Sequence, residues 1–206
     1  MIKVTLLGDS IRLLGYGNVV PQLLGDEYEV YQPSENCRFS KYTLRGLFDW
    51  KKGMTGSRIV HWNNGLWDVC ELFGDGNFTS EDEYIQNMLR ITDILLANHD
   101  KVIFATTTPV ADANTICKNS FITRYNDIIV PRLQEKGVII NDLYSLVAQD
   151  TDKYISEDTI HLSEQGVQLC AEQVSLCIKS VAQQINDADL KTASESEKNI
   201  IVRTPV

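Results

Sequence analysis

Residues 1–10 of the chain read MIKVTLLGDS, a short apolar segment that runs into a glycine, an aspartate and a serine. Apolar side chains dominate residues 1–7, which predicts a strand buried inside a sheet. Gly8 follows directly and allows the backbone to turn tightly. Such a turn displays the hydroxyl group of Ser10 above the edge of the sheet. A serine hydroxyl in this position becomes a nucleophile only if a base elsewhere in the chain takes its proton.

Segments with strand character alternate with helical segments along the chain. The predicted strands are 1–7, 28–31, 58–62, 101–107 and 138–140, and the predicted helices are 11–24 (broken), 43–52, 80–98, 121–136 and 163–185. Alternation with short connections predicts an α/β domain of three layers, with helices on both faces of a mostly parallel five-stranded sheet. Sites in such sheets lie beyond the carboxyl ends of the strands. Ser10 and Asn63 each follow a predicted strand, so we expect them to converge.

Length and composition predict one domain followed by a polar tail. The 206 residues, of which 43% are hydrophobic, suffice for a single core, and we assign that domain to residues 1–185. Residues 186–206 are rich in Asp, Ser, Glu and Lys and contain a short apolar run at 199–202. We predict that this tail is mobile or docked on a partner, with the apolar run adding an edge strand or forming a homodimer contact.

Charge and cysteine content exclude several classes of protein. The formal net charge of −9 disfavours a nucleic-acid partner, because binding phosphates requires a clustered basic surface. The cysteines are five in number and show no Cys-x-x-Cys spacing, so we interpret them as reduced thiols that hold no metal. No signal-peptide pattern and no long apolar stretch is present, and we expect a cytoplasmic chain that does not insert into membranes.

A base and an acid for Ser10 are found near the far end of the chain. Residues 158–162 read DTIHL, which places Asp158 three residues before His161. His161 can accept the serine proton, and the Asp158 carboxylate can reach the other ring nitrogen and select one tautomer. Each residue also has an ordinary structural role open to it, since serine caps helices, aspartate favours turns and a histidine is often packed. The presence of all three favours a nucleophile, base and acid.

Three segments together resemble signature blocks of the SGNH, or GDSL, hydrolases. These segments are residues 8–10 (GDS), residues 62–65 (WNNG) and the pair Asp158 and His161, in this order. The resemblance covers roughly residues 2–180 and implies a flavodoxin-like fold that hydrolyses an ester or a related acyl bond. It implies that Ser10 is the nucleophile, that His161 is the general base and acid, and that Asp158 orients His161. No cofactor or metal is implied.

The resemblance also implies an oxyanion hole formed by Asn63 and the backbone N–H of Ser10, and here the chain departs from the family pattern. The second block usually supplies a glycine whose N–H completes the hole, whereas this chain has Lys41 at that position. Any residue except proline retains the N–H, although a positive φ at Lys41 would be strained. Asn64 follows Asn63 where the family often has aspartate, so Asn64 is a second candidate for the oxyanion donor.

The substrate is indicated less directly. Arg12 and Arg38 fall near the predicted site and can bind an anionic group, and Trp67 can stack on a sugar ring or line an acyl pocket. The loops are polar, and no apolar lid of the kind expected for a long-chain lipase is apparent. We therefore predict hydrolysis of a short acyl ester, preferably carbohydrate O-deacetylation, through an acyl-Ser10 intermediate. The alternatives are a thioesterase or lysophospholipase on the same scaffold, and a catalytically silent binding module that is supported by Lys41.

Overall fold

A computed structural model describes the backbone of residues 1–201 and the side chains of residues 1–190. Five strands form one sheet in the order β2-β1-β3-β4-β5, and every neighbouring pair is parallel. The strands are β1 (Ile2–Leu7), β2 (Tyr28–Tyr31), β3 (Ile59–Trp62), β4 (Lys101–Ala105) and β5 (Ile139–Asn141). The predicted five-stranded parallel sheet is thus confirmed, with strand ends within two residues of the predicted ones.

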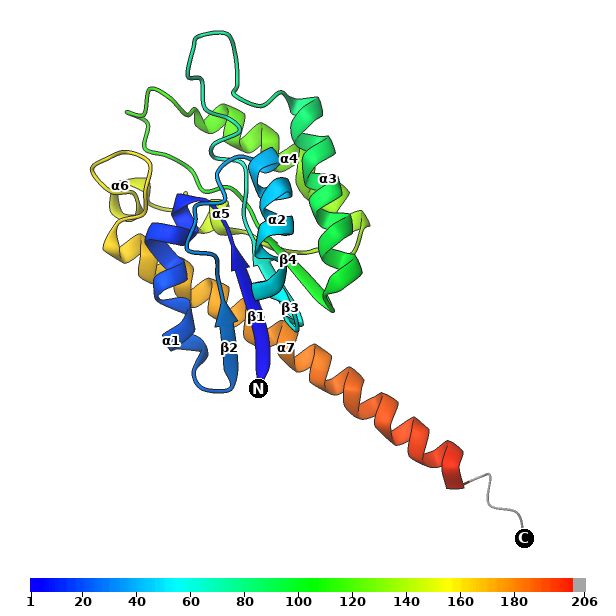
Figure 1. Ribbon diagram of the computed structural model, residues 1–206. Helices are drawn as coiled ribbons and strands as arrows, with labels where there is room; N and C mark the ends of the chain where they lie inside the picture. The colour runs from blue at the N-terminus through cyan, green and yellow to red at the C-terminus, as the bar shows by residue number, and fades with distance from the viewer. Residues whose placement is uncertain (202–206) are drawn as a thin grey trace.

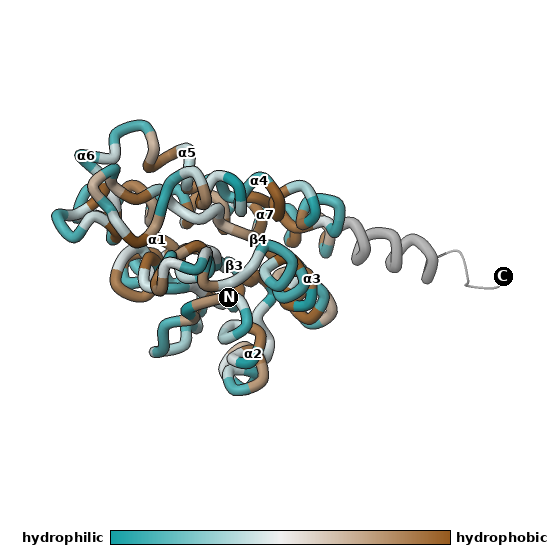
Figure 2. Tube along the Cα trace, turned by 90° about the horizontal axis from the view of Figure 1, so that it is seen from above, coloured by the Kyte–Doolittle hydropathy of each residue, from teal (hydrophilic) through white to brown (hydrophobic). Residues whose placement is uncertain are grey.

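Helices cover both faces of the sheet (Figure 1). Helices α1 and α7 pack against each other on one face, and α2, α3 and α4 form a row on the other. Figure 2 shows α7 and α2 on opposite sides of β3 and β4. The helices are α1 (Val20–Leu24), α2 (Ser40–Met54), α3 (Glu81–Asn98), α4 (Asn119–Glu135), α5 (Leu143–Val147), α6 (Thr151–Tyr154) and α7 (Glu164–Ile201). The three-layer arrangement follows from right-handed crossovers between parallel strands.

The segment after β1 is helical but broken, as its glycines and proline predicted. A single π-helical turn at Ile11–Gly15 is followed by a 3₁₀ turn at Tyr16–Asn18 and then by α1. The short helices α5 and α6 were not predicted from the sequence. Both begin at an aspartate whose side chain accepts a backbone N–H three residues on, which is a capping signal that can be read from sequence.

The register of the sheet fixes which loops meet. Leu7 pairs with Trp62, and Trp62 pairs with Phe104, so β1, β3 and β4 end at the same level. All three of these side chains are fully buried, and both faces of the sheet are covered with apolar residues. A one-residue slip would move an entire strand's side chains to the other face, so this register is strongly specified. Consequently the residues that follow β1 and β3 lie side by side above the sheet.

The last helix does not end near Ile185, as predicted, but continues to Ile201 and projects away from the domain (Figure 1). Its first half packs under the sheet through Val174, Ile178 and Val181, which are buried. The apolar run at 199–202, for which we predicted an edge strand or a partner contact, lies outside the residues whose side chains are described. Among the residues described, no helix is both long and apolar enough to span a lipid bilayer.

Candidate active site

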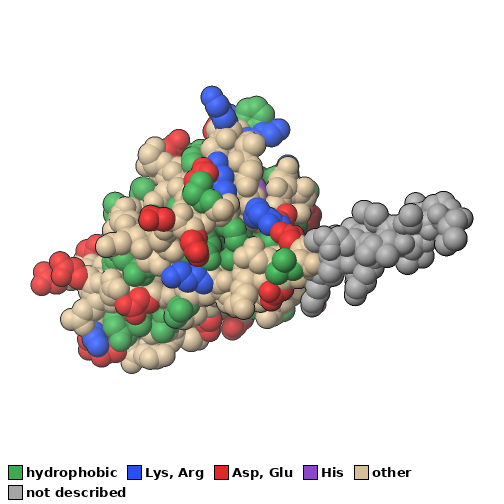
Figure 3. Space-filling view, turned by 90° about the horizontal axis from the view of Figure 1, so that it is seen from below, with side chains coloured by type: hydrophobic (Ala, Val, Ile, Leu, Met, Phe, Trp, Pro, Cys, Tyr) green, Lys and Arg blue, Asp and Glu red, His purple; other side chains and the backbone are tan. Residues whose placement is uncertain are grey.

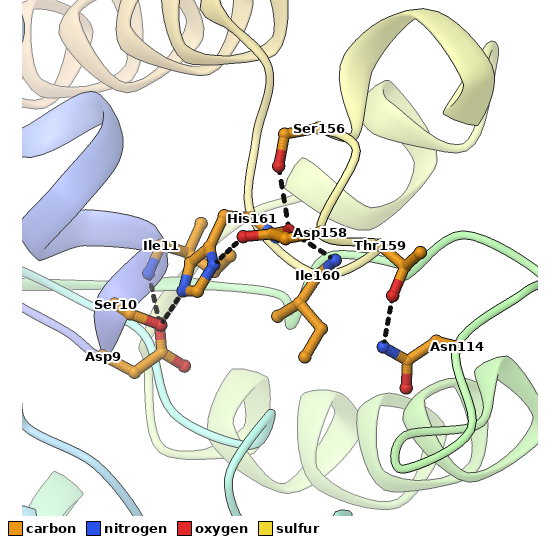
Figure 4. A network of polar contacts seen from close by, with 9 residues as sticks. All are labelled: Asp9, Ser10, Ile11, Asn114, Ser156, Asp158, Thr159, Ile160 and His161. Carbon is orange, nitrogen blue, oxygen red and sulfur yellow. Dashed lines mark hydrogen bonds and ion pairs between the residues drawn. The ribbon is translucent and has the colours of Figure 1, made fainter.

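Ser10 lies in the turn between β1 and the first helical turn, at the carboxyl end of the sheet. Its side chain makes no capping hydrogen bond to the helix that follows, which argues against the capping role. Instead, Oγ of Ser10 lies 2.9 Å from Nε2 of His161 (Figure 4). The two residues are 151 positions apart in the chain, so only the fold brings them together. Ser10 is 7% exposed, so the residue is largely shielded from solvent.

His161 and Asp158 lie in a closed loop that precedes α7. Nδ1 of His161 is 2.6 Å from Oδ2 of Asp158, so the imidazole ring bridges the carboxylate and the serine hydroxyl (Figure 4). An antiparallel bridge between Ile155 and Leu162 closes the base of the loop. A hydrogen bond from the N–H of Ser156 to the carbonyl of His161, at 2.7 Å, closes it further. The loop therefore holds the ring in one orientation.

The Asp158 carboxylate is stabilised in its charged form. Oδ1 of Asp158 accepts hydrogen bonds from the N–H groups of Ile160 and His161 and from the hydroxyl of Ser156, at 2.8–2.9 Å. Partial burial acts to raise the pKa of Asp158, but these donors and the His161 ring outweigh it and hold the pKa well below its usual range. The carboxylate is therefore ionised at neutral pH. A charged acceptor at Nδ1 keeps the proton on that nitrogen and leaves Nε2 free to accept the serine proton.

Backbone strain is concentrated in the loops around the site. Among the described residues, only Arg38 (φ 51°) and Thr159 (φ 71°) are non-glycine residues with positive φ. Thr159 lies between Asp158 and His161, and two hydrogen bonds from the 106–118 loop hold it. Its carbonyl accepts from the N–H of Ala111, and its hydroxyl accepts from the side chain of Asn114 (Figure 4). Residues with strained backbone persist where the surrounding structure fixes them, which is common at functional sites.

Asn63 is the better candidate for the oxyanion donor, although its amide also acts on the buried carboxyl of Asp9, whose pKa it lowers against the effect of burial. Nδ2 of Asn64 donates to the carbonyl of Arg38 at 2.8 Å, and its Oδ1 accepts from the indole of Trp62 at 2.7 Å. Asn64 is fully buried, and its oxygen and one N–H of its NH₂ group are engaged, so the structure favours Asn63 as the candidate oxyanion donor. Asn64 instead connects residues 36–41, here called the second-block loop, to β3. Oδ1 of Asn63 accepts the hydroxyl of Tyr16 at 2.8 Å, which turns its NH₂ group the other way.

Tyr16 is a site residue that the sequence did not reveal. It is fully buried, and its ring packs edge-on against that of His61 with centroids 5.7 Å apart. Burial raises the pKa of Tyr16 well above its usual value, so the hydroxyl stays protonated and can donate. A tyrosine in a helical segment usually indicates core packing. Nothing in its spacing showed that its hydroxyl would reach Asn63.

Gly8 is required because other groups approach it closely. A Cβ atom at this position would lie 2.0 Å from Oδ1 of Asn63 and 2.7 Å from Cβ of Arg12. The φ angle of Gly8 is not positive, so another residue could adopt its backbone conformation. Glycine is needed here because a larger side chain would not fit. The N–H of Gly8 contacts Sγ of Cys37 at 3.2 Å, and its carbonyl accepts from the N–H of Cys37. The turn before Ser10 is thus attached to the second-block loop.

Lys41 does not carry the strain that a glycine replacement suggested. It is the second residue of α2, and it is not among the residues with positive φ. Its ammonium group pairs with Glu83 at 2.8 Å, away from the backbone of the loop. The first N–H groups of a helix lack intrahelical partners, and those of Ser10 and Lys41 find no acceptor among the described residues. Two backbone donors are therefore free near the end of the sheet where Ser10 lies.

Asp68 fixes the start of α2. Its carboxylate accepts the N–H of Ser40 at 3.0–3.1 Å and the hydroxyl of Ser40 at 2.7 Å. Asp68 is fully buried, and burial raises its pKa to about 6, although the hydrogen bonds from Ser40 act to lower it. A carboxylate at a helix N-terminus is favoured by the helix dipole. This buried contact ties the 63–80 loop to the helix that presents Lys41.

The raised pKa of Asp68 predicts a loss of stability with rising pH. The folded-state pKa lies above the unfolded-state value, so the stabilisation is complete below about pH 4 and is lost as the pH rises through 6. A difference of about two pKa units corresponds to about 3 kcal/mol. We expect urea unfolding of the wild type to show a larger fall in stability between pH 4 and pH 7 than Asp68→Asn, which retains an acceptor for Ser40. Equal falls in the two proteins would contradict this role.

Of the three residues predicted to contact substrate, one is buried and two are exposed. Arg12 is 1% exposed, and its guanidinium donates to the carbonyls of Pro33, Gly8 and Glu35 at 2.7–3.2 Å. Arg12 is therefore a structural residue, and the prediction that it binds substrate is wrong. Arg38 is exposed and lies over the ring of Tyr42 at 4.8 Å. Trp67 is 38% exposed, so both it and Arg38 are accessible to a ligand.

The other histidines have packing roles. His61 is fully buried, and burial lowers its pKa to about 3, so it is neutral at physiological pH. Nδ1 of His99 lies 2.7 Å from the carbonyl of Ser57, at the end of the sheet opposite Ser10. Within the described part of the chain, no group of three or more His, Cys, Asp or Glu side chains is arranged to hold a metal ion.

A cavity of about 510 Å³ lies between the carboxyl ends of α2 and α3, and it is distant from Ser10. It is lined by residues that precede β3 and β4, including Met54, Gly56 and His99. These lie at the end of the sheet where the strands begin, which is the side drawn in Figure 3. On that face, basic and acidic side chains are interspersed with hydrophobic ones among the coloured residues. The cavity contains none of the groups gathered around Ser10.

No protein-family model matches the chain, and no curated protein matches it. Solved structures do match. The acetyl xylan esterase AlAXEase is 19% identical with a TM-score of 0.72, over 86% of this chain and 100% of the other. A GDSL-like lipase from Bacteroides thetaiotaomicron is 18% identical with a TM-score of 0.69, over 87% and 88%. A catalytic mutant of Axe2, an acetylxylan esterase from Geobacillus stearothermophilus, is 15% identical with a TM-score of 0.67, over 84% and 92%.

These comparisons establish the fold. The chain has the same α/β/α architecture as structures described as acetyl xylan esterases and GDSL-like lipases, over most of its length. The fold implied by the sequence resemblance is therefore confirmed. At identities below 20% the likeness carries no information about substrate. Function has to be argued from the site.

Proposed function

We propose that this chain is a serine-dependent carboxylic ester hydrolase of the SGNH, or GDSL, family. The single observation that carries the proposal is the continuous relay from Oγ of Ser10 through the ring of His161 to Asp158, with contacts of 2.9 and 2.6 Å. A nucleophile hydrogen-bonded to a base that is oriented by a third group is the arrangement needed for acyl transfer. The fold shared with GDSL-like lipases and acetyl xylan esterases supports it.

The reaction begins with transfer of the acyl group to the enzyme. Oγ of Ser10 attacks the ester carbonyl carbon while Nε2 of His161 takes its proton. The imidazolium that forms is stabilised by the ionised Asp158. The carbonyl oxygen becomes an oxyanion, which the amide of Asn63 and the N–H groups of Ser10 and Lys41 stabilise. Fixed donors of this kind act in the transition state because they are already oriented.

The second half of the reaction regenerates the enzyme. His161 gives its proton to the leaving alcohol, which departs and leaves an acyl group on Ser10. Water then attacks the acyl carbon, with His161 accepting the proton of the water and returning a proton to Ser10. The same oxyanion donors serve both steps. The overall result is hydrolysis of the ester to an acid and an alcohol.

A short acyl group on a carbohydrate is the substrate that we favour. Trp67 is 38% exposed in the loop that follows Asn63, and an aromatic ring there can stack on a sugar. The guanidinium of Arg38 over the ring of Tyr42 forms a second polar and aromatic surface in the second-block loop.

A long-chain substrate, as for a thioesterase or lysophospholipase, is a second candidate. No apolar lid was apparent from the sequence, but the structure exposes Leu72 (48%), Phe73 (79%) and Phe78 (42%) in the 63–80 loop. Exposed apolar side chains that share one loop can form a surface that binds an apolar group. By contrast, the case for a silent binding module rested on Lys41, and the unstrained helical conformation of Lys41 weakens it.

Hydrolysis of a p-nitrophenyl ester series from acetate to long chains tests the proposal and separates the two candidates. We expect the highest kcat/KM with acetate and release of acetate from acetylated xylo-oligosaccharides. A maximum with long chains would favour the second candidate. Failure of the wild type to hydrolyse any ester, or equal hydrolysis by Ser10→Ala, would overturn the enzymatic assignment.

Asn63→Ala is expected to lower kcat about a hundredfold with little change in KM. Loss of one oxyanion donor costs roughly 3 kcal/mol in the transition state and affects substrate binding much less. Tyr16→Phe, which frees the Asn63 amide to rotate but retains its NH₂ group, should lower kcat by a smaller factor. Steady-state kinetics with p-nitrophenyl acetate measure both. An unchanged kcat in Asn63→Ala would remove Asn63 from the oxyanion hole.

A further inference from the structure

Two cysteines that are 47 positions apart meet at the rim of the sheet where Ser10 lies. Cys70 belongs to the 63–80 loop between β3 and α3, and Cys117 belongs to the 106–118 loop between β4 and α4. Both loops rise above the carboxyl ends of the strands (Figure 1). The two sulfur atoms are 2.8 Å apart. A disulfide bond is about 2.05 Å long, so a shift of less than about 1 Å would allow the bond to form.

The backbones around this pair are already held together. The N–H of Glu71 donates to the carbonyl of Ile116 at 2.9 Å, directly beside the two cysteines. Sγ of Cys70 also contacts the carbonyl of Leu66 at 3.2 Å. On the other loop, the N–H of Cys117 donates to Oδ1 of Asn114 at 2.7 Å. The backbones of the two loops therefore need to move little to bring the two sulfur atoms into bonding distance.

Cys70 differs from the other cysteines of the chain, including its partner Cys117, which is buried and whose pKa is raised by the hydrogen bond with Cys70 and by burial. Cys37 and Cys170 are buried, and burial raises their pKa values to about 11 and about 12. Cys177 is partly exposed, but burial also raises its pKa to about 11. Cys70 is partly exposed, and a hydrogen bond with Cys117 lowers its pKa. The thiolate is the reactive form of cysteine, so Cys70 is the thiol most prepared to react.

We propose that Cys70 and Cys117 are a redox pair that forms a reversible disulfide and fastens the 63–80 loop to the 106–118 loop. With a low-molecular-weight disulfide such as glutathione disulfide, the Cys70 thiolate attacks one sulfur and releases one glutathione thiolate. Cys117 loses its proton and attacks the Cys70 sulfur of the mixed disulfide, which releases the second glutathione thiolate. Two protein thiols are oxidised, one glutathione disulfide is reduced, and the two protons pass to the released thiolates.

The two loops that this disulfide joins both contact the candidate active site. The 63–80 loop begins with Asn63, and the 106–118 loop holds Thr159 through Ala111 and Asn114. Closing a loop of 47 residues restricts the unfolded chain and therefore stabilises the fold. Because the sulfurs already touch, the bond should leave the positions of Ser10 and His161 unchanged. Oxidation is thus expected to increase stability without abolishing any activity of the site.

Oxidation of the full chain with glutathione disulfide, compared with the same protein kept in dithiothreitol, tests the proposal. Thiol titration after denaturation should fall from five thiols to three, since two are consumed. Peptide mapping without reduction should find Cys70 and Cys117 in one cross-linked peptide. The Tm should rise by about 5–10 °C on oxidation, and dithiothreitol should reverse the change.

Matched variants separate this pair from general cysteine chemistry. Cys177→Ser removes the other partly exposed thiol and should leave the oxidation-dependent rise in Tm intact. Cys70→Ser and Cys117→Ser should each abolish it. Five thiols remaining after oxidation, a stable glutathione adduct on Cys70, or a disulfide between two chains would each overturn the proposal. So would a disulfide between Cys70 and Cys117 that leaves Tm unchanged. The mapping uses the wild type, so a variant that folds poorly does not affect it.

Discussion

Ser10→Ala is expected to lower kcat for ester hydrolysis on the order of 10⁴-fold or more while leaving Tm almost unchanged. The substitution removes the oxygen atom that would carry the acyl group in the proposed intermediate. Members of such a triad act as a unit, so His161→Ala should lower kcat to a similar depth, and the double variant should be no worse than either single one. Stability should change little, because within the part of the chain that the structure describes the Ser10 hydroxyl makes a hydrogen bond only with His161. Steady-state kinetics and a thermal melt measure both effects.

Ser163→Ala is a matched control for this substitution, since it removes the same hydroxyl oxygen from a serine two residues after His161. The hydroxyl of Ser163 accepts the N–H of Gly166 and donates to the carbonyl of Lys153, at the start of α7. Its loss should therefore lower the free energy of unfolding by about 1 kcal/mol and leave kcat largely intact. If the kcat of Ser10→Ala equals that of the wild type, Ser10 is not the nucleophile.

Asp158→Asn is expected to lower kcat on the order of 10³-fold, which is less than the effect of Ser10→Ala. The amide can still accept the N–H groups of Ile160 and His161 through its oxygen, so the loop should keep its shape. Its NH₂ group, however, would face Nδ1 of His161 and favour the tautomer that carries the proton on Nε2. That tautomer cannot accept the proton of Ser10. The KM of the variant should equal that of the wild type. A raised KM would indicate a disrupted binding site, whereas a lowered kcat alone indicates the loss of the general base.

The stability of the same variant provides an independent measurement. The pKa of Asp158 is held below its usual range in the folded protein, so Asp158 contributes stability above the unfolded-state pKa that is lost as the pH falls. Asp158→Asn should therefore lose less stability than the wild type when the pH is lowered from 5 to 3. Parallel acid-denaturation curves for the two proteins would show that the carboxylate is not stabilised as the geometry indicates.

The fold could be predicted because its signals are local. Five apolar segments of strand length alternate with helical segments, and burial on both faces of a parallel sheet requires such segments. The errors lie where local signals compete or are weak. The helix predicted to end near Ile185 continues to Ile201, because no proline or glycine interrupts the later residues. The short helices α5 and α6 depend on single capping aspartates, Asp142 and Asp150.

The candidate catalytic residues could be named from the sequence because their chemistry limits the choice. Only three histidines are present, and one of them follows an aspartate by three residues, near the end of the domain. The roles of neighbouring residues could not be assigned in this way. Arg12 was expected to bind substrate, but its guanidinium is buried against backbone carbonyls. Asn63 and Asn64 are adjacent and chemically identical, so no local pattern could separate them.

The sequence by itself determined the α/β architecture and the three residues of the candidate relay, because strand burial and proton-transfer chemistry each restrict residue type and spacing. Only the tertiary structure decided how those residues are supported. The contact of Tyr16 with Asn63, the meeting of Cys70 with Cys117 and the burial of Asp68 under α2 join segments that are distant in the chain. Hydrogen bonds and burial at such distances depend on sheet register and helix packing, which no single segment of the sequence contains.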